Sequence, residues 1–221
     1  MRITLLGLLI WVFSFACYAQ SSKTGNWFVY FGNQKISPKI NFHNEIQYRN
    51  YNLIGDINQL LIRVGIGYDL SKNNNNLLLG YGYIQSHFYD STQENKYHTN
   101  EHRIFQQYIT KTISSGYYFL HRFRLEERFI PNDLQYRFRY FLSVNKPLNN
   151  KTMQPKTIYA SAYNEIFVNT ANQLFDRNRI YGGVGYVFHK DIKAEFGFMM
   201  QSTLKKNQQQ FQVTLFNNFS Y

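Results

Sequence analysis

Polar and apolar residues alternate with a period of two along residues 117–145. In the first half of this stretch the polar positions are Arg122, Arg124, Glu126 and Arg128. In the second half they include Gln135, Arg137, Arg139, Ser143 and Asn145. An α-helix has a period of 3.6 and cannot place every second residue on one face. Pro131, Asn132 and Asp133 supply turn chemistry between the halves, so the stretch predicts two strands joined by a short turn.

The two faces of this predicted hairpin differ in an unusual way. An ordinary half-buried strand shows mixed Thr, Ser and Lys to water, whereas here the polar face carries mainly guanidinium and carboxylate groups. The opposite face is rich in aromatic residues, among them Phe123, Phe129, Tyr136 and Phe138. This combination is typical of a sheet whose apolar side meets lipid and whose polar side lines a closed interior.

The same alternation recurs along the chain and predicts a single all-β domain. The candidate strands cover residues 26–31, 40–49, 59–68, 77–83, 101–107, 117–129, 134–145, 158–169, 177–188, 193–201 and 211–221. A longer polar connection is expected at 90–100, before the least regular segment, 101–107. Gly80 and Gly82 occupy inward positions, where they make room for bulky side chains from across the lumen or allow sharp curvature. The predicted fold is an antiparallel up-and-down transmembrane β-barrel.

The number of strands does not fit the usual rule, because eleven segments are found and single-chain bacterial barrels have an even number. Either residues 26–31 lie in the lumen or across its mouth, which leaves ten strands, or one strand is missed and the count is twelve. With Tyr221 on the periplasmic side, the turns at 70–76, 115–116 and 189–191 face the periplasm. The connection at 90–100 then faces outward, as such barrels require.

Residues 1–19 have the pattern of a secretory signal, which leaves 20–221 for the barrel. Arg2 is the charged start, residues 3–15 the apolar core and 17–19 the small-residue site, with cleavage expected before Gln20. Cys17 is the only cysteine. A lipoprotein site at Cys17 would want a Leu-like residue where Ser14 stands, and cleavage after Ala19 would remove the only thiol.

Composition supports export and membrane insertion through strands. Aromatic residues make up 19% of the 221 residues, and mean hydropathy is −0.44. A polar lumen explains this low hydropathy, because half of the strand positions face it. After the leader no apolar run approaches the ~20 residues that a spanning helix needs. The net charge of +11 is not assigned to nucleic-acid binding, because the chain is exported and carries no RNA-binding signature.

Two features resemble known proteins. A chain that stops on an aromatic residue, here Tyr221, resembles the C-terminal signal that the barrel assembly machinery of the bacterial outer membrane recognises. The runs 121–129, 164–167 and 178–183 resemble the DUF2490 family, uncharacterised barrel proteins common in Bacteroidetes. The resemblance covers roughly residues 27–221. It implies an outer-membrane β-barrel in contact with outer-membrane lipid and transfers no catalytic residue.

No catalytic residue, cofactor or metal is expected. His87, His98 and His102 fall near the long connection, but their spacing fits no common metal-ligand pattern. Glu126 and Glu127 point to opposite faces of one strand, so they cannot act together on a substrate. An enzyme acting on outer-membrane lipid is the alternative function.

The arginines carry the sharpest signal, because every Arg after the leader shares the inward parity of its strand. The candidate lumen residues are Glu101, Arg103, Arg122, Arg124, Glu126, Arg128, Arg137, Arg139, Glu165, Arg177 and Arg179. One interpretation is a narrow lumen filled by salt bridges. The other uses the excess of ten Arg over five inward Glu, which would make a positive interior that attracts anions. The expected function is therefore a structural barrel or a small anion-leaning pore.

Overall fold

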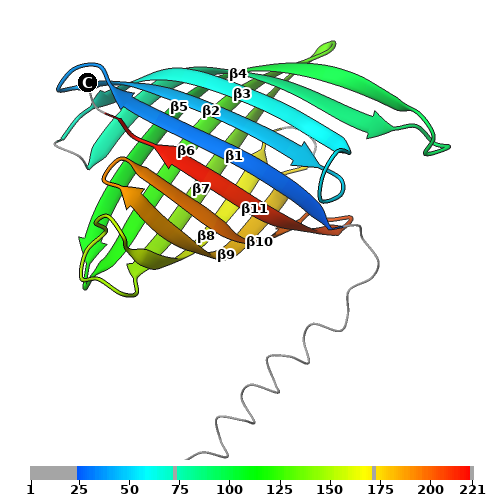
Figure 1. Cartoon of the computed structure of the whole chain (residues 1–221). Helices are drawn as coiled ribbons and strands as arrows, with labels where there is room; N and C mark the ends of the chain where they lie inside the picture. The colour runs from blue at the N-terminus through cyan, green and yellow to red at the C-terminus, as the bar shows by residue number, and fades with distance from the viewer. Residues whose placement is uncertain (1–23, 72–73, 171–172, 220–221) are drawn as a thin grey trace, which may run out of the picture.

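The computed structural model describes residues 24–71, 74–170 and 173–219, which form one closed β-barrel (Figure 1). Its strands are β1 (Gly25–Lys35), β2 (Ile40–Asn50), β3 (Ile57–Asp69), β4 (Asn75–Tyr89), β5 (Lys96–Ser114), β6 (Tyr117–Ile130), β7 (Asp133–Pro147), β8 (Ile158–Asn169), β9 (Phe175–His189), β10 (Ile192–Ser202) and β11 (Asn207–Asn217). No helix in the described part of the chain is long and apolar enough to cross a membrane. The expected signal at 1–19 and the terminal Tyr221 lie outside the described residues.

The all-β barrel is confirmed, but the strand count of ten or twelve is wrong. Strands adjacent in sequence pair antiparallel around the barrel, and β1 closes it by pairing parallel with β11. The parallel register runs from Gly25 opposite Gln210 to Gly32 opposite Asn217. Residues 26–31 are thus part of the wall and neither plug the lumen nor cross its mouth. A parallel ladder also satisfies the backbone groups of both edge strands, so an odd number of strands can close.

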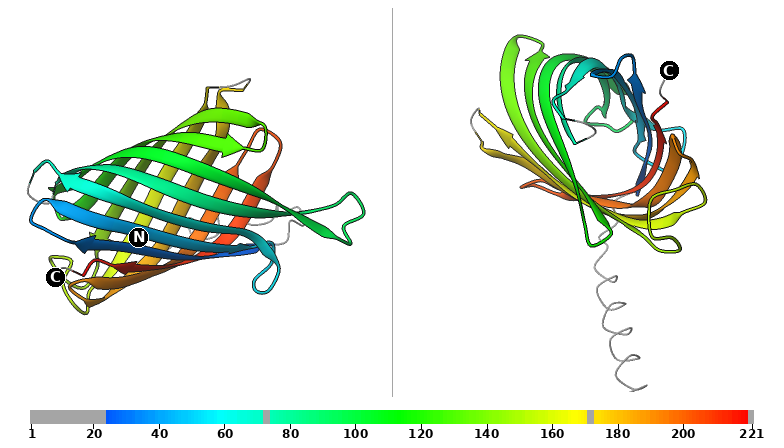
Figure 2. Two further views of the ribbon diagram at one scale, coloured as in Figure 1. Left: turned by 90° about the horizontal axis from the view of Figure 1, so that it is seen from above. Right: turned by 90° about the vertical axis from the view of Figure 1, so that its left-hand side faces the viewer.

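The two ends of the barrel carry different sets of connections (Figure 2). The end where β11 stops, called the C-terminal end below, holds the connections 36–39, 70–74, 115–116, 148–157 and 190–191. The other end, called the hairpin end, holds 51–56, 90–95, 131–132, 170–174 and 203–206. Because β1 is parallel to β11, it begins at the hairpin end.

The β4–β5 hairpin extends beyond both neighbouring strands at the hairpin end (Figure 2). Its pairing continues to Tyr89 opposite Lys96, whereas β6 pairs with β5 only as far as His102. The polar connection expected at 90–100 is therefore too long, and the loop is confined to 90–95. Residues 96–100 pair with β4, which satisfies their backbone groups and makes them strand. Within the loop, Thr92 donates a 2.7 Å hydrogen bond that lowers the pKa of Asp90.

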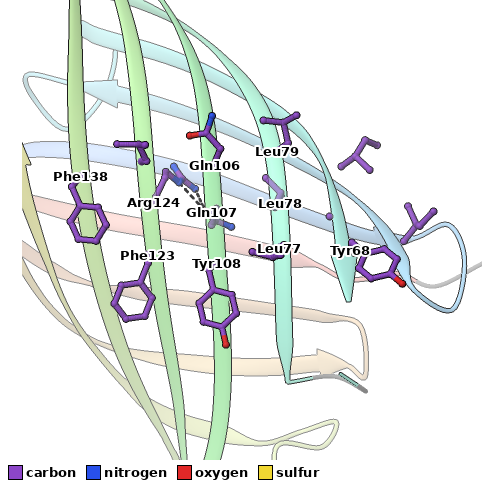
Figure 3. Close-up of a pocket in the computed structure, with 14 residues that line it drawn as sticks. Tyr68, Leu77, Leu78, Leu79, Gln106, Gln107, Tyr108, Phe123, Arg124 and Phe138 are labelled. Carbon is purple, nitrogen blue, oxygen red and sulfur yellow. Dashed lines mark hydrogen bonds between the residues drawn. The ribbon is translucent and has the colours of Figure 1, made fainter. Parts of the chain in front are cut away.

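The interior is polar and the exterior apolar, the reverse of a soluble domain. Among the described residues, 22 polar or charged side chains are buried against 11 apolar ones. Large apolar side chains are exposed on the outer face, including Leu79 at 60% and Phe138 at 43%. Several of these line a shallow outer hollow of about 620 Å³, where Phe138, Phe123 and Tyr108 stand in a row across β7, β6 and β5 (Figure 3).

Inward glycines leave room for large side chains, as expected, but the side chains come from the adjacent strand. A Cβ atom added to Gly80 would collide with the ring of Phe105, which stands directly opposite on β5. A Cβ atom on Gly185 would collide with the ring of Tyr159, directly opposite on β8. Each glycine therefore lets a neighbouring aromatic ring lie flat against the inner wall.

Candidate functional site

Glu126 on β6 is the centre of the buried charge network. Its side chain is fully buried, and it accepts hydrogen bonds of 2.6 Å from Arg137 and 2.6 Å from Arg139, both on β7. The guanidinium groups of Arg63, Arg103 and Arg124 lie 3.6, 3.7 and 3.6 Å from the same carboxylate. Five cations from four strands thus share one anion. Period-two alternation on each strand brings them together, because it turns all of these side chains to one face.

Glu165 on β8 is the second anion of the network. It accepts hydrogen bonds of 2.6 Å from Arg139 and 2.8 Å from Arg122, and Arg179 on β9 lies 3.4 Å away. Glu45 on β2 is the third, with Arg63 at 2.6 Å. These acids extend the network across the barrel from β2 to β9.

At the hairpin end, Glu101 binds two arginines. It accepts bidentate hydrogen bonds from Arg103, at 2.6 and 3.0 Å, and from Arg128, at 2.6 and 3.1 Å. Because Arg103 also reaches Glu126, this cluster joins the central one.

Asp176 is a network member that sequence reasoning missed. It accepts a 2.9 Å hydrogen bond from Arg137 and a 3.0 Å hydrogen bond from Arg177. Pairing of β8 with β9 skips Asp176, because Phe167 stands opposite Arg177 and Val168 opposite Phe175. This β-bulge breaks the strict alternation from which the inward set was counted. Asp176 stands at an even position, whereas the inward residues Arg177 and Arg179 stand at odd positions. Alternation extended to Asp176 therefore predicts that it points outward.

The structure joins all eleven candidate lumen residues, from Glu101 to Arg179, into one connected network through Glu126. Of the ten arginines after the leader, nine form ion pairs with Glu45, Glu101, Glu126, Glu165 or Asp176. The tenth, Arg49, donates a 3.0 Å hydrogen bond to Gln47 and stacks 3.8 Å from the ring of Trp27. The arginines are therefore neutralised mainly by shared acids, because nine of them pair with only five carboxylates.

A cavity of about 840 Å³ occupies the interior between this network and the C-terminal end. Arg122, Arg139, Glu165 and Arg179 form its inner boundary, and Lys35, Lys111, Asp69 and Lys193 line it toward the C-terminal end. Between the two charged zones its wall is mixed, and polar side chains such as Asn41, His43 and Ser143 lie beside a group of apolar ones. This group, called the apolar belt below, consists of Val29, Phe31, Leu78, Ile109, Leu120 and Phe141. A polar inward face was expected along each strand, so this belt was missed as well.

Other groups considered in the sequence stay separate from the network. His102 Nδ1 lies 2.5 Å from the hydroxyl of Tyr81 on the outer face, and the rings of His87 and His98 are 6.0 Å apart. Within the described ranges, no three His, Cys, Asp or Glu side chains are grouped as metal ligands would be. Glu127 points away from Glu126, is partly exposed, and accepts a 3.2 Å hydrogen bond from the exposed Gln106.

Comparison with known proteins gives one match. A family model described as a protein of unknown function, DUF2490, matches residues 24–212, which span β1 to β10 and the first part of β11. No curated protein and no solved structure matches the chain. Because the model covers most of the sequence, the chain belongs to the DUF2490 family.

Proposed function

We propose that this protein is a bacterial outer-membrane β-barrel whose arginine-rich lumen is closed by its salt-bridge network, so that it acts as a structural barrel and not as an open diffusion pore. The apolar outer face supports insertion into lipid, because side chains such as Leu79 and Phe138 would otherwise stand in water. The leader-like pattern of residues 1–19 supports export. Outer-membrane lipid and, through the last strand, the barrel assembly machinery are its partners.

The observation that carries this proposal is the position of Glu126. This carboxylate has no exposed surface and is surrounded in the barrel interior by guanidinium groups from β3, β5, β6 and β7. We take this packed cluster to be what closes the lumen. Removing one partner of a buried ion pair costs about 3–5 kcal/mol, so such a network resists opening.

A small anion-leaning pore is the second form of the proposal. Nine arginines share five acidic partners and Arg49 has none among the described residues, so any ions that leak through the network would meet a positive interior. The double variant Arg137→Glu with Arg139→Glu should then reverse the selectivity. The alternative function is an enzyme that acts on outer-membrane lipid. None of the contacts described in the network favours it, and we propose no catalytic role.

The proposal also gives the barrel an orientation in the outer membrane. The C-terminal end faces the periplasm and the β4–β5 hairpin faces outward. Since β1 begins at the hairpin end, the chain enters the barrel wall from the outer side.

Fractionation tests the proposed location and type of protein. The protein should be recovered with the outer membrane and migrate faster on gels before boiling than after it, because a closed barrel stays folded in detergent. Recovery as a soluble periplasmic protein would overturn the proposal.

A further inference from the structure

The cavity at the C-terminal end is lined in part by apolar side chains that face its interior volume. Val29 and Leu78 are buried there, each at 5% exposure, beside the apolar side chains of Phe31, Ile109 and Phe141. Ion pairing of the interior does not explain why apolar side chains are placed there. Its volume, about 840 Å³, lies within the range of about 300–1,000 Å³ that is typical of small-molecule sites.

The charged groups that line the cavity are predominantly cationic. Eight Lys or Arg side chains line it against five Asp or Glu side chains. Toward the C-terminal end, Lys35 pairs with Asp69 at 3.3 Å. Lys193 lies 3.6 Å from Glu195.

Of the four lysines that line the cavity, Lys111 is the one without an ion pair among the described residues. The charged groups near enough to act on it are one acid, Asp69, and two further cations, Lys193 and Lys35. Lys111 comes from β5, Lys193 from β10 and Lys35 from β1, so three cations from different strands lie near one another at this end, with Asp69 paired to Lys35 and Glu195 to Lys193. The surplus charge stands next to the apolar belt.

We infer that this cavity binds an amphiphile with one acyl chain and an anionic head group. The head group lies at Lys111, with Lys35 and Lys193 beside it, because a carboxylate or phosphate accepts charge-assisted hydrogen bonds from ammonium groups. The chain extends inward along the apolar belt and stops at the boundary set by Arg122. The inference rests on the proposed barrel function and names the ligand class that such a barrel takes up from its C-terminal end.

Trp27 provides a direct probe of the site. It lines the cavity, is 5% exposed, and the guanidinium carbons of Arg49 and Arg179 lie 3.8 and 4.8 Å from the centre of its ring. Trp11, in the leader, is the other tryptophan of the chain. With Trp11→Phe, the fluorescence of the whole protein reports on Trp27 whether or not the leader is removed.

The experiment is a titration of this protein in lipid nanodiscs with dibromostearate, whose bromine atoms quench nearby tryptophan. Saturable quenching is expected, and stearate should reverse it. Acetate, inorganic phosphate and hexadecyltrimethylammonium should not. Displacement by acetate or phosphate alone would show a site for small anions, and displacement by the cationic amphiphile would show a site without charge selection. Either result would overturn the inference.

Two variants place the ligand within the cavity. Lys111→Glu should weaken dibromostearate binding about tenfold or more, the factor expected for one lost charge-assisted hydrogen bond. Ser143→Phe puts a ring into the cavity wall and should also weaken binding. The control Lys205→Glu makes the same charge change in the 203–206 connection at the hairpin end and should leave binding unchanged.

Folding is checked separately for each variant by heat-modifiable migration. If the folded band is present and quenching does not saturate, or if Lys111→Glu and Ser143→Phe bind as tightly as the parent, the inference fails and the proposed barrel stands. If the parent protein gives no folded band in the membrane fraction, the proposed function itself fails.

Discussion

Arg139 and Glu126 are joined diagonally across β6 and β7, with Nη1 of Arg139 2.6 Å from Oε1 of Glu126. The residue directly opposite Arg139 is another arginine, Arg124. Two like charges at this spacing would repel each other. The diagonal carboxylate relieves the repulsion, and Arg124 turns its remaining donors to Gln107, at 2.8 and 2.5 Å. The crowded arginines of the central hairpin are therefore compatible because one acid sits between them.

Replacing this acid tests how much the network stabilises the barrel. Glu126→Gln keeps the shape of the side chain but leaves five guanidinium groups around a neutral amide. We expect the free energy of unfolding in urea to fall by about 3–5 kcal/mol, because a buried ion pair loses one partner.

The neighbouring residue supplies the control. Glu127→Gln makes the same chemical change on the outer face, where the carboxylate has one exposed hydrogen bond from Gln106. Its effect should stay within about 0.5 kcal/mol, as for most surface substitutions. Equal stability of the two variants would contradict a stabilising role for the buried network.

A pair of glycines tests the packing of the inner wall. Gly185→Ala should destabilise the barrel by about 1–3 kcal/mol, the usual cost of overpacking, because the new methyl group meets the ring of Tyr159. That ring is held in place by a 2.9 Å hydrogen bond from its hydroxyl to Glu195. Gly182→Ala, with no atom within 4 Å of its added Cβ, is the matched control. A larger loss of stability at Gly182 than at Gly185 in urea unfolding would refute this assignment.

The sequence predicted the features that depend on strict alternation. The inward positions of Arg124, Glu126, Arg137 and Arg139 follow from a period of two, and the structure places all four in the buried network. Asp176 was missed because a bulge shifts its register, and a bulge depends on the pairing of two strands. Such pairing cannot be read from one strand alone.

The first strand was misjudged for a related reason. β1 is apolar on both faces, with Trp27 and Val29 buried and Phe28 39% exposed, so alternation gave no sign of its inner face. The apolar belt has the same origin, because Leu120 and Phe141 line the cavity from positions of β6 and β7 where a polar residue was expected. These apolar residues line a cavity that is formed by several strands together. Its place in the barrel could therefore not be predicted from any single strand.

Labelling from one side tests the parallel closure of β1. In a Cys17→Ser background, we place single cysteines at Thr24, Thr92 or Lys190 and treat intact cells with a membrane-impermeant maleimide. Thr24→Cys and Thr92→Cys should react together, because β1 begins at the hairpin end, and Lys190→Cys should react only after the cells are opened. Thr24→Cys that reacts together with Lys190→Cys would mean that β1 runs antiparallel to β11.

Adjacent residues of β7 test which face meets lipid. A fluorophore on Leu142→Cys should be quenched by brominated phospholipids in the bilayer, whereas one on Ser143→Cys, which lines the cavity, should be protected. The two sites share nearly the same depth, so depth does not account for a difference. The reverse order of quenching would refute the inward assignment, since a slip of one residue turns every side chain to the other face.

Planar-bilayer recording tests most directly whether the network closes the lumen. The comparison variant carries serine at Arg124, Glu126, Arg137 and Arg139, which removes the central side chains, and its conductance steps show that barrels of this type insert. We predict steps from this variant and none from the unmodified protein at the same density of folded barrels. Stable conductance steps of equal size from both proteins would contradict a lumen closed by Glu126 and its arginines.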